Sequence, residues 1–272
     1  LAAAIESMLR QTFQDVDLLG IDDGSIDASG DILRSYARTD QRIIVLQNPT
    51  TEGIVRTLNR GIAVARGKYI ARMDADDVSS PERLATQVDF LDRHPACAFV
   101  GSWAKIINQQ GQVISYVRLK TSDAEIKVHL IIGNQFIHSA VMIKREALAA
   151  VGGYRADYPW NEDYDLWLRL SEQYPAANIP RYLVSWRENS PGAISSVHRA
   201  EQDRNTASLR RHYIATTMPR LHGHVALLKA ALRIKPDDAI LADYFFSNYQ
   251  MNRARFAWWR LRARVIAMVK RH

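Results

Sequence analysis

The chain has 272 residues, of which 47% are hydrophobic and 24% charged, so it can bury a sizeable core and does not have the composition of a disordered polymer. Its one cysteine, Cys97, excludes an internal disulfide, and its place in an apolar run favours a core position. No run of 18 apolar residues occurs, so no membrane-spanning helix is expected. The formal net charge is +7, and residues 253–272 hold seven Lys or Arg and no acid, so the basic character belongs to that end.

Helical and strand-like patterns alternate through the first third of the sequence. Helices are expected at 1–11, 26–38 and 54–65, and short apolar strands at 16–21, 43–46 and 69–73. This alternation predicts βαβ crossovers, and hence an α/β fold with a Rossmann-like, mainly parallel central sheet flanked by helices.

The pattern changes after residue 97. Strands predicted at 98–107 and 113–117 flank Asn108–Gly111, which is typical of a hairpin turn, so antiparallel strands are added to the sheet. Further elements are expected as helices at 123–132, within 161–170 and at 197–214, and as strands at 140–143 and 182–186. We divide the chain into a catalytic-type domain at 1–200 and a helical C-terminal extension at 201–272.

An acidic cluster follows the strand predicted at 69–73. Asp74, Asp76 and Asp77 lie within four residues and repel one another unless a cation holds them. Oxygen-only ligation at the carboxyl end of a strand suits Mg²⁺ or Mn²⁺, which usually also bind substrate phosphates. Ser80 and Pro81 fit the N-cap and first position of a helix that starts just past the cluster. The alternative is that Asp76 and Asp77 are solvated turn residues before that helix.

Two other acidic pairs stand out. Asp22 and Asp23 follow the strand predicted at 16–21. Glu162 and Asp163 begin a predicted helix, whose dipole favours ionised carboxylates while their mutual repulsion raises one pKa. Such a pair can supply a base for an attacking hydroxyl beside a metal site that holds a diphosphate leaving group. Acids that merely begin a helix are the competing interpretation.

In order and spacing, these segments resemble the family 2 glycosyltransferases of the GT-A fold over roughly residues 1–200. The resemblance is carried by Gln11–Phe13, Ile21–Ser25 with Asp27, Gly53 with Asn59 and Gly61, Gly67–Ile70, Asp74–Asp77, Pro81–Leu84 and Glu162–Trp167.

The resemblance implies roles for these residues. Asp22, Asp23 and Asp74 would hold a nucleotide-sugar, Asp22 by bonding the base, and Asp74 with Asp76 would form a DxD metal motif. Asp163 would be the base of a single inverting displacement, with Glu162 shaping its environment. The implied donor is a UDP-sugar, and the acceptor is a saccharide or a lipid-linked molecule in bacterial cell-surface polysaccharide synthesis.

The sequence departs from the family at its start. Members begin with an apolar strand that lines the nucleotide pocket, whereas this chain opens in a helical pattern at Leu1. We therefore expect that this first strand is lacking, that the sheet has a gap beside the strand that ends at Asp22, and that the chain is inactive or poorly folded. Gly20 is also expected to weaken its strand.

Weaker signals and alternatives remain open. His138 is placed near the acceptor by the resemblance, but a structural histidine is the commoner case. Residues 253–272 combine an apolar face with arginines, which fits either contact with an anionic membrane surface or burial; we expect a cytoplasmic enzyme, peripheral at the inner face of the plasma membrane, and no nucleic-acid partner. A haloacid dehalogenase-like phosphohydrolase with Asp74 as nucleophile and Asp76 as acid, or a non-catalytic remnant, are the competing functions.

Overall fold

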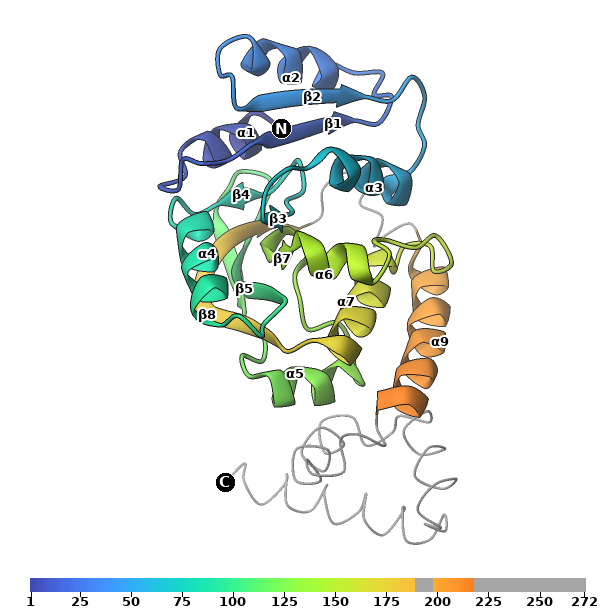
Figure 1. Cartoon of the computed structure of the whole chain (residues 1–272). Coiled ribbons are helices and arrows are strands. Elements are labelled where there is room, and N and C mark those ends of the chain that lie inside the picture. Colours follow the sequence, from blue (N-terminus) through green and yellow to red (C-terminus); the bar gives the residue numbers. More distant parts are fainter. Residues whose placement is uncertain (189–197, 218–272) are drawn as a thin grey trace, which may run out of the picture.

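The computed structural model describes residues 1–188 and 198–217, which form two sheets with helices packed around them (Figure 1). The smaller sheet pairs β1 (Leu18–Asp22) with β2 (Ile43–Gln47) in parallel. The helix α2 (Ser29–Ala37) connects them, as the alternating pattern predicted. Ile5 of α1 (Ala2–Leu9) joins Leu33 and Ile43 in a small core that holds this layer together.

The larger sheet has the strand order β3-β7-β5-β8-β4, with β6 paired to the outer part of β5. Its strands are β3 (Tyr69–Ala71), β4 (Val78–Ser79), β5 (Phe99–Ile107), β6 (Val113–Val117), β7 (Met142–Lys144) and β8 (Ala176–Arg187). Only the β5–β8 ladder is parallel among its described pairs. The sheet is thus more mixed than the mainly parallel one expected, because hairpins and short returns cannot provide parallel crossovers.

The two sheets are separate. Among the described strands β1 pairs with β2 alone, and β3 pairs with β7 alone, so no ladder bridges the space between β1 and β3. The interruption expected beside the strand that ends at Asp22 is therefore present in the structure.

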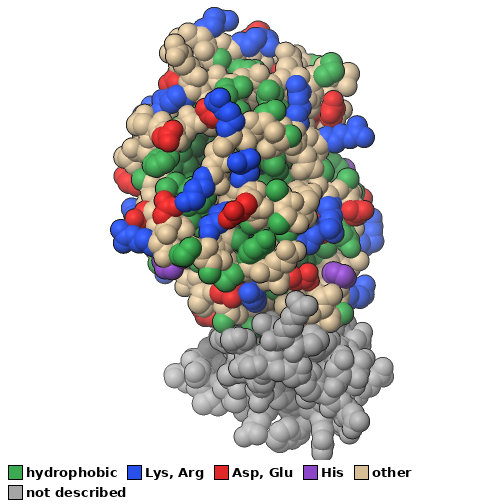
Figure 2. Space-filling model, viewed as in Figure 1, with side chains coloured by type: hydrophobic (Ala, Val, Ile, Leu, Met, Phe, Trp, Pro, Cys, Tyr) green, Lys and Arg blue, Asp and Glu red, His purple; other side chains and the backbone are tan. Residues whose placement is uncertain are grey.

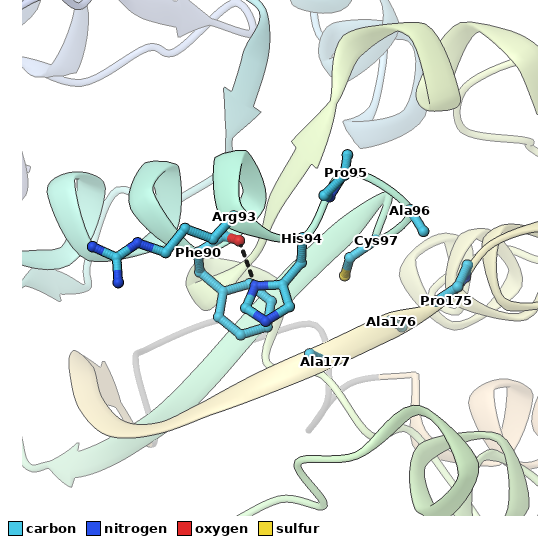
Figure 3. Close-up of a pocket in the computed structure, with 9 residues that line it drawn as sticks. All are labelled: Phe90, Arg93, His94, Pro95, Ala96, Cys97, Pro175, Ala176 and Ala177. Atoms are coloured by element: carbon cyan, nitrogen blue, oxygen red, sulfur yellow. Dashed lines mark hydrogen bonds between the residues drawn. The ribbon is translucent and has the colours of Figure 1, made fainter.

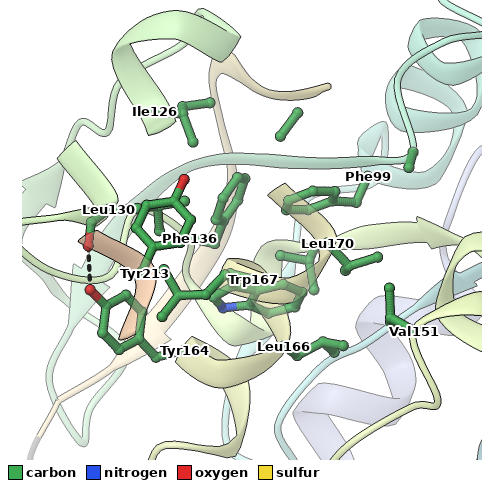
Figure 4. Close-up of a cluster of buried hydrophobic side chains, with 14 of the residues drawn as sticks. Phe99, Ile126, Leu130, Phe136, Val151, Tyr164, Leu166, Trp167, Leu170 and Tyr213 are labelled. Atoms are coloured by element: carbon green, nitrogen blue, oxygen red, sulfur yellow. Dashed lines mark hydrogen bonds between the residues drawn. The ribbon is translucent and has the colours of Figure 1, made fainter. Parts of the chain in front are cut away.

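Helices cover both faces of the larger sheet. They are α3 (Ile54–Val64), α4 (Arg83–Arg93), α5 (Asp123–Leu130), α6 (Arg145–Ala150), α7 (Glu162–Gln173), α9 (Arg199–Thr217) and a short 3₁₀ turn (His138–Ala140). Leu84 and Leu91 of α4 pack with Val100 and Met142 on one face. The main core on the other face is built by α5, α7 and α9 (Figure 4).

One helix start differs from its prediction. The helix α4 begins at Arg83 with Glu82 as N-cap, whereas Ser80 and Pro81 were expected to start it. The short strand β4 keeps this segment extended, because the Ser80 N–H donates to the carbonyl of Leu183 at 2.9 Å. The Ser80 hydroxyl bonds the Glu82 carboxylate at 2.6 Å instead of capping the helix.

The C-terminal part is described only as far as α9. Leu209, Tyr213 and Ile214 of this helix belong to the main core, so the first part of the predicted 201–272 extension packs onto the preceding domain. The basic segment 253–272 lies outside the described residues. None of the helices in the described ranges is both long and apolar enough to cross a membrane.

Candidate active site

The main core fixes the position of α7. Trp167 stacks on Phe99 with ring centroids 5.8 Å apart and packs against Phe136 at 5.6 Å, while the Tyr164 hydroxyl donates to the carbonyl of Leu130 (Figure 4). Burial of this face holds the helix rigidly. The first turn of α7, which carries Glu162 and Asp163, therefore has a defined place at the edge of the core.

Both carboxylate oxygens of Asp163 are engaged. The Asn134 side-chain amide donates to Oδ2 at 2.8 Å, and the Tyr164 backbone N–H donates to Oδ1 at 2.6 Å. Burial raises the pKa of Asp163, although these hydrogen bonds and the charge of Arg72 oppose the rise. The result is an oriented carboxylate that is more basic than an exposed aspartate.

Glu162 is a different kind of carboxyl group. It is 6% exposed, and its Oε2 has no hydrogen-bond partner among the described residues. Burial, together with the neighbouring charge of Asp163, raises the pKa of Glu162 to about 7. Both pKa values of the pair are thus raised, mainly by burial, whereas mutual repulsion was expected to raise one of them.

The end of β3 carries an ion pair that no sequence motif predicted. The Arg72 guanidinium donates to both carboxylate oxygens of Asp74, and the Ser139 hydroxyl donates to Asp74 Oδ2 at 2.8 Å. Burial alone would raise the pKa of Asp74, but the charge and hydrogen bonds of Arg72 outweigh burial and lower it. Asp74 is therefore a firmly ionised group.

The rest of the acidic loop is fastened to the end of β8. The Arg187 backbone N–H donates to Asp77 Oδ1 at 2.7 Å, and its Nε donates to the carbonyl of Asp76 at 2.9 Å. Asp77 is fully buried with Oδ2 unpartnered among the described residues, and burial raises its pKa to about 6. Asp77 is accordingly an internal brace, and Asp76, half-buried at the surface of the loop, faces a different environment.

His138 lies beneath these groups as a neutral ring. Its Nε2 is 2.7 Å from the hydroxyl of Tyr154, and burial and then the charge of Arg72 lower its pKa well below the usual value. The Asn59 side chain exchanges two hydrogen bonds with the backbone of Tyr154, at 2.9 and 3.0 Å. This contact explains the place of Asn59 in the sequence pattern, since it fixes the loop that carries Tyr154.

Arg72 connects the two acidic groups of this site. Its charge influences the ionisation of Asp74 on one side and of Glu162 and Asp163 on the other. The structure therefore brings Asp74, Asp76, Asp77, His138, Glu162 and Asp163 into one region, although they are up to 89 positions apart in the sequence. We call this region the β3 cluster.

The carboxylates at the end of β1 are held differently. Asp23 accepts hydrogen bonds from the N–H groups of Glu52 and Gly53 and from Asn48, which together lower its pKa against the effect of burial. Asp22 accepts one from the N–H of Ser25, while its buried Oδ2 has no partner in the described part of the chain. Both oxygens of Asp23 thus accept hydrogen bonds from the loop, whereas Oδ2 of Asp22 can still accept one from a bound molecule.

The fit of a divalent metal can be judged from the donor set. Within residues 1–188 and 198–217, no group of three or more His, Cys, Asp or Glu side chains is arranged to hold a metal ion. The loop does present oxygen donors from aspartates at a strand end, which suits Mg²⁺ or Mn²⁺ when substrate phosphates complete the coordination. The described side chains alone do not make up a metal site, so a bound metal ion would need substrate phosphates to complete its ligands.

Four residues that contact the β3 cluster were given no role by the sequence: Arg72, Asn134, Ser139 and Tyr154. Asn134, Ser139 and Tyr154 act through hydrogen bonds to groups 29, 65 and 16 positions away, which no local pattern marks, whereas Arg72 bonds Asp74 two positions on. A weak signal existed for Arg72, because an arginine at the end of an otherwise apolar strand is rarely buried without a charged partner.

A separate apolar pocket lies at the end of α4 and next to the start of β8 (Figure 3). It is lined by Phe90, Arg93, His94, Pro95, Ala96, Cys97, Pro175, Ala176 and Ala177. The His94 ring stacks on Phe90 at 4.2 Å, and burial raises the pKa of the Cys97 thiol to about 11. None of the predicted site residues lines this pocket, and Cys97 is an inert core residue as expected.

One face of the molecule shows acidic and basic side chains interspersed (Figure 2). This agrees with the absence of net charge before residue 253 and offers no broad single-sign surface on that face.

Comparison with known proteins decides the family. The model of glycosyl transferase family 2 matches residues 1–152, more than half of the chain. The chain belongs to glycosyl transferase family 2. This glycosyltransferase is 34% identical over 194 residues to the putative glycosyltransferase EpsE of Bacillus subtilis, covering 70% of this chain and 69% of the relative. It is 30% identical to the O-antigen biosynthesis glycosyltransferase WbnJ of Escherichia coli, covering 68% and 72% of the two chains.

Solved structures confirm the GT-A fold of this glycosyltransferase. S. aureus TarS 1-349 in complex with UDP-GlcNAc superposes with a TM-score of 0.65 at 15% identity, over 90% of this chain and 68% of that one. The mannosyltransferase PcManGT from Pyrobaculum calidifontis, in complex with GDP-Man and Mn²⁺, gives a TM-score of 0.57 at 15% identity over 98% and 83%.

Proposed function

We propose that this enzyme is an inverting, metal-dependent glycosyltransferase that moves a sugar from a nucleotide-sugar, preferably a UDP-sugar, to a saccharide or lipid-linked acceptor. The observation that carries the proposal is the carboxylate of Asp163. It is half-buried, is held through both oxygens by Asn134 and the Tyr164 N–H, and lies in one electrostatic unit with Asp74. An oriented base next to a strand-end acidic loop is what a direct displacement requires.

The proposed reaction is a single displacement. The acceptor hydroxyl oxygen forms a bond to the anomeric carbon of the donor sugar, while the bond from that carbon to the diphosphate oxygen breaks. The hydroxyl proton passes to Asp163, whose pKa is raised by burial and which is therefore a better base than an exposed aspartate. Attack from the face opposite the leaving group inverts the anomeric configuration.

The diphosphate leaving group is assigned to the acidic loop after β3, opposite Asp163. The loop with Asp74 and Asp76 would hold Mg²⁺ or Mn²⁺, which when bound neutralises charge on the departing diphosphate. Asp22 and Asp23 are assigned to the nucleotide, and the unpartnered buried Oδ2 of Asp22 supports a hydrogen bond to the base. His138, bonded to Tyr154, would support the acceptor side from below.

Relatives guide the substrate class. TarS is described with UDP-GlcNAc and PcManGT with GDP-Man and Mn²⁺, and relatives carry names from O-antigen and amylovoran biosynthesis. We extend this to bacterial cell-surface polysaccharide synthesis at the cytoplasmic face of the membrane, with residues 253–272 contacting the lipid surface.

Two competing functions find less support. A haloacid dehalogenase-like phosphohydrolase would need Asp74 as an open nucleophile, whereas Arg72 and Ser139 occupy its oxygens. A non-catalytic remnant would not require hydrogen bonds that orient both oxygens of the Asp163 carboxylate.

Calorimetric titration with UDP, with and without Mn²⁺, tests the proposal on the wild-type chain and on Asp76→Ala. Metal-dependent binding that the substitution abolishes is the expected result. A folded wild-type chain that binds no UDP or GDP in the presence of Mn²⁺ would contradict the proposal. Hydrolysis of an aryl phosphate would instead support the phosphohydrolase.

A further inference from the structure

The residue three positions before Asp163 has an unusual backbone conformation. In the described part of the chain, Trp160 is the only residue other than glycine with a positive φ, 66°. The left-handed region is disfavoured for a bulky side chain, so such a residue keeps this conformation only where its surroundings impose it. Trp160 directly precedes Asn161, the N-cap of α7, and the proposed base lies in the first turn of that helix. The conformation of Trp160 therefore sets the direction in which α7 begins.

The surroundings that impose this conformation belong to α9. The indole Nε1 of Trp160 donates to the Glu201 carboxylate at 3.0 Å, and the Trp160 carbonyl accepts from the Gln202 side-chain amide at 3.0 Å. The His198 ring, just before the helix, stacks on the indole with ring centroids 4.0 Å apart and planes at 15°. The start of α9 thus holds both the side chain and the backbone of Trp160.

The residues on either side of Trp160 are held by the same helix. The Asn205 side-chain amide donates to the carbonyl of Pro159 at 2.9 Å. An N-cap side chain ordinarily accepts a hydrogen bond from the first turn, but within the described residues Asn161 makes no such bond to α7. Its amide donates to the Thr206 hydroxyl at 2.9 Å instead. The start of α7 is therefore fixed from α9 rather than by a local cap.

These contacts come from one face of α9. Its members are half-buried and have the i, i+1, i+4, i+5 spacing of a helical face, whereas residues 203–204 between them are exposed. We call this set, Glu201, Gln202, Asn205 and Thr206, the polar face of α9. It is taken up by the loop before α7.

The rest of α9 anchors this face to the core. Its later turns bury three side chains in the main core, and Arg210 Nε donates to the carbonyl of Ile131, just after α5. Three residues further along the chain, Asn134 donates to Asp163 Oδ2 at 2.8 Å. The helix α9 thus contacts both segments that fix the Asp163 carboxylate, the loop before α7 and the loop after α5.

We propose that Trp160 is a positioning residue of the reaction, held by the polar face of α9 in the left-handed conformation so that the Asp163 carboxylate points to the acceptor. Trp160 acts through the first turn of α7. Displacing a reacting group by about 1 Å from its productive position can lower the rate by about 100-fold. The inference rests on the proposed function, because it presumes that Asp163 takes the proton of the acceptor.

Two substitutions at position 160 separate the backbone conformation from the side chain. Trp160→Ala and Trp160→Gly both remove the indole and its contacts, but only glycine adopts a positive φ without strain. We expect kcat to fall about 30-fold in Trp160→Ala and about threefold in Trp160→Gly, with the donor KM within about twofold of wild type in both. Release of UDP from UDP-GlcNAc, with Mn²⁺ and an acceptor extract, measures both constants.

Amide hydrogen exchange reports on the place of Asp163 without turnover. The Tyr164 N–H donates to Asp163 Oδ1 at 2.6 Å, so its exchange, measured by NMR, should be about tenfold faster in Trp160→Ala. The exchange of the Leu170 amide, further along α7, should stay as in wild type, because the main core holds that part of the helix. This pattern distinguishes a displaced first turn from general destabilisation.

Variants of α9 test the source of the constraint. Glu201→Ala removes the acceptor of the indole N–H, so kcat should fall about fivefold. Glu201→Gln keeps an acceptor oxygen, so its kcat should stay within about twofold of wild type. Asp203→Ala is the matched control, because Asp203 lies in the same turn but is exposed, and it should change neither kcat nor the exchange of the Tyr164 amide.

The outcomes separate this inference from the proposed function. Equal kcat losses in Trp160→Ala and Trp160→Gly, or unchanged Tyr164 exchange in Trp160→Ala, overturn the role of Trp160 alone. A folded wild-type chain that binds neither UDP nor GDP with Mn²⁺ overturns the proposed function and this inference with it. If wild type binds UDP but does not turn over UDP-GlcNAc, the Tyr164 exchange decides. If Trp160→Ala does not fold, Glu201→Ala decides: a kcat loss that Glu201→Gln does not share supports the inference, and no loss, or an equal loss in both, overturns it.

Discussion

The carboxylates at the end of β1 and those of the β3 cluster look alike in sequence, but the structure stabilises them by different means. Asp23 is saturated by two backbone N–H groups and an amide, all from the loop before α3. The β3 cluster relies on one buried guanidinium and leaves Glu162 and Asp77 with an oxygen that has no partner in the described part of the chain. The first arrangement favours loop stability, and the second keeps carboxyl groups whose pKa values differ widely within one site.

The largest expected effect is on catalysis at Asp163. Asp163→Asn keeps the shape of the side chain but removes the base, so turnover of the donor should fall by about 10³-fold. Release of UDP in the presence of an acceptor extract measures this, with circular dichroism to verify folding. The exposed aspartate in the preceding loop, Asp157, provides the control as Asp157→Asn, for which turnover should not change. Equal turnover by wild type and Asp163→Asn would remove Asp163 from the mechanism.

The next effect tests the stabilising role assigned to Asp23. Asp23→Ala leaves the N–H groups of Glu52 and Gly53 without their acceptor, so the free energy of unfolding should fall by about 2 kcal/mol. Urea denaturation at neutral pH measures the loss. Asp31→Ala, which breaks an exposed ion pair with Arg34, should cost about 0.5 kcal/mol or less. Similar losses in the two variants would mean that the backbone contacts of Asp23 contribute little.

The pH dependence of stability tests the raised pKa of Glu162 in the β3 cluster. Its pKa of about 7 in the folded chain lies above the ordinary value of 4.5, so the folded state binds this proton more tightly than the unfolded state. The corresponding stability is full below the ordinary pKa and is lost as pH rises through about 7. Glu162→Gln cannot ionise, so at pH 8 its stability relative to wild type should exceed that at pH 4 by about 3 kcal/mol. Urea titrations at both pH values measure the difference, and no pH-dependent difference would refute the raised pKa.

Much of the fold follows from sequence because it depends on local periodicity. The predicted bounds of β6 agree with the structure, and α3 and β2 agree within one residue, since apolar spacing and turn residues determine such elements. The three-residue strand β7 and the two-residue strand β4 were shifted or missed, because tertiary pairing rather than periodicity creates them. The helix α6 was missed because its six residues are too few to show a helical period.

The candidate site was predictable only in part, for a similar reason. Acidic residues at the ends of predicted strands and helices can be recognised from the sequence, and Asp74, Glu162 and Asp163 do lie in one region. Their hydrogen-bond partners cannot be recognised in this way. Asn134 bonds Asp163 from a loop 29 positions away, and Ser139 bonds Asp74 from 65 positions away. The function assigned to each of these carboxylates stays a prediction until the variants are measured.

The smallest effect concerns the packing beneath the β1 carboxylates, at Gly20. An isolated glycine weakens a strand, but a Cβ built at Gly20 would lie 2.6 Å from Cδ2 of Leu33, so the glycine permits close packing of α2 on β1. Leu33 belongs to the small core with Ile5 and Ile43 and is 6% exposed, which limits its freedom to move. Gly20→Ala should therefore lower the free energy of unfolding by about 1 kcal/mol, the overpacking cost exceeding the gain from a less flexible unfolded chain.

A double-mutant cycle with Leu33→Val tests the cause of this loss. If contact with Leu33 is responsible, Gly20→Ala should cost less in the Leu33→Val background than in wild type, with urea denaturation as the measurement. Additive losses would place the strain elsewhere. A stabilising Gly20→Ala would show that this layer is loosely packed, and the loop bonds of Asp23, rather than the core beneath them, would then be what fixes the end of β1.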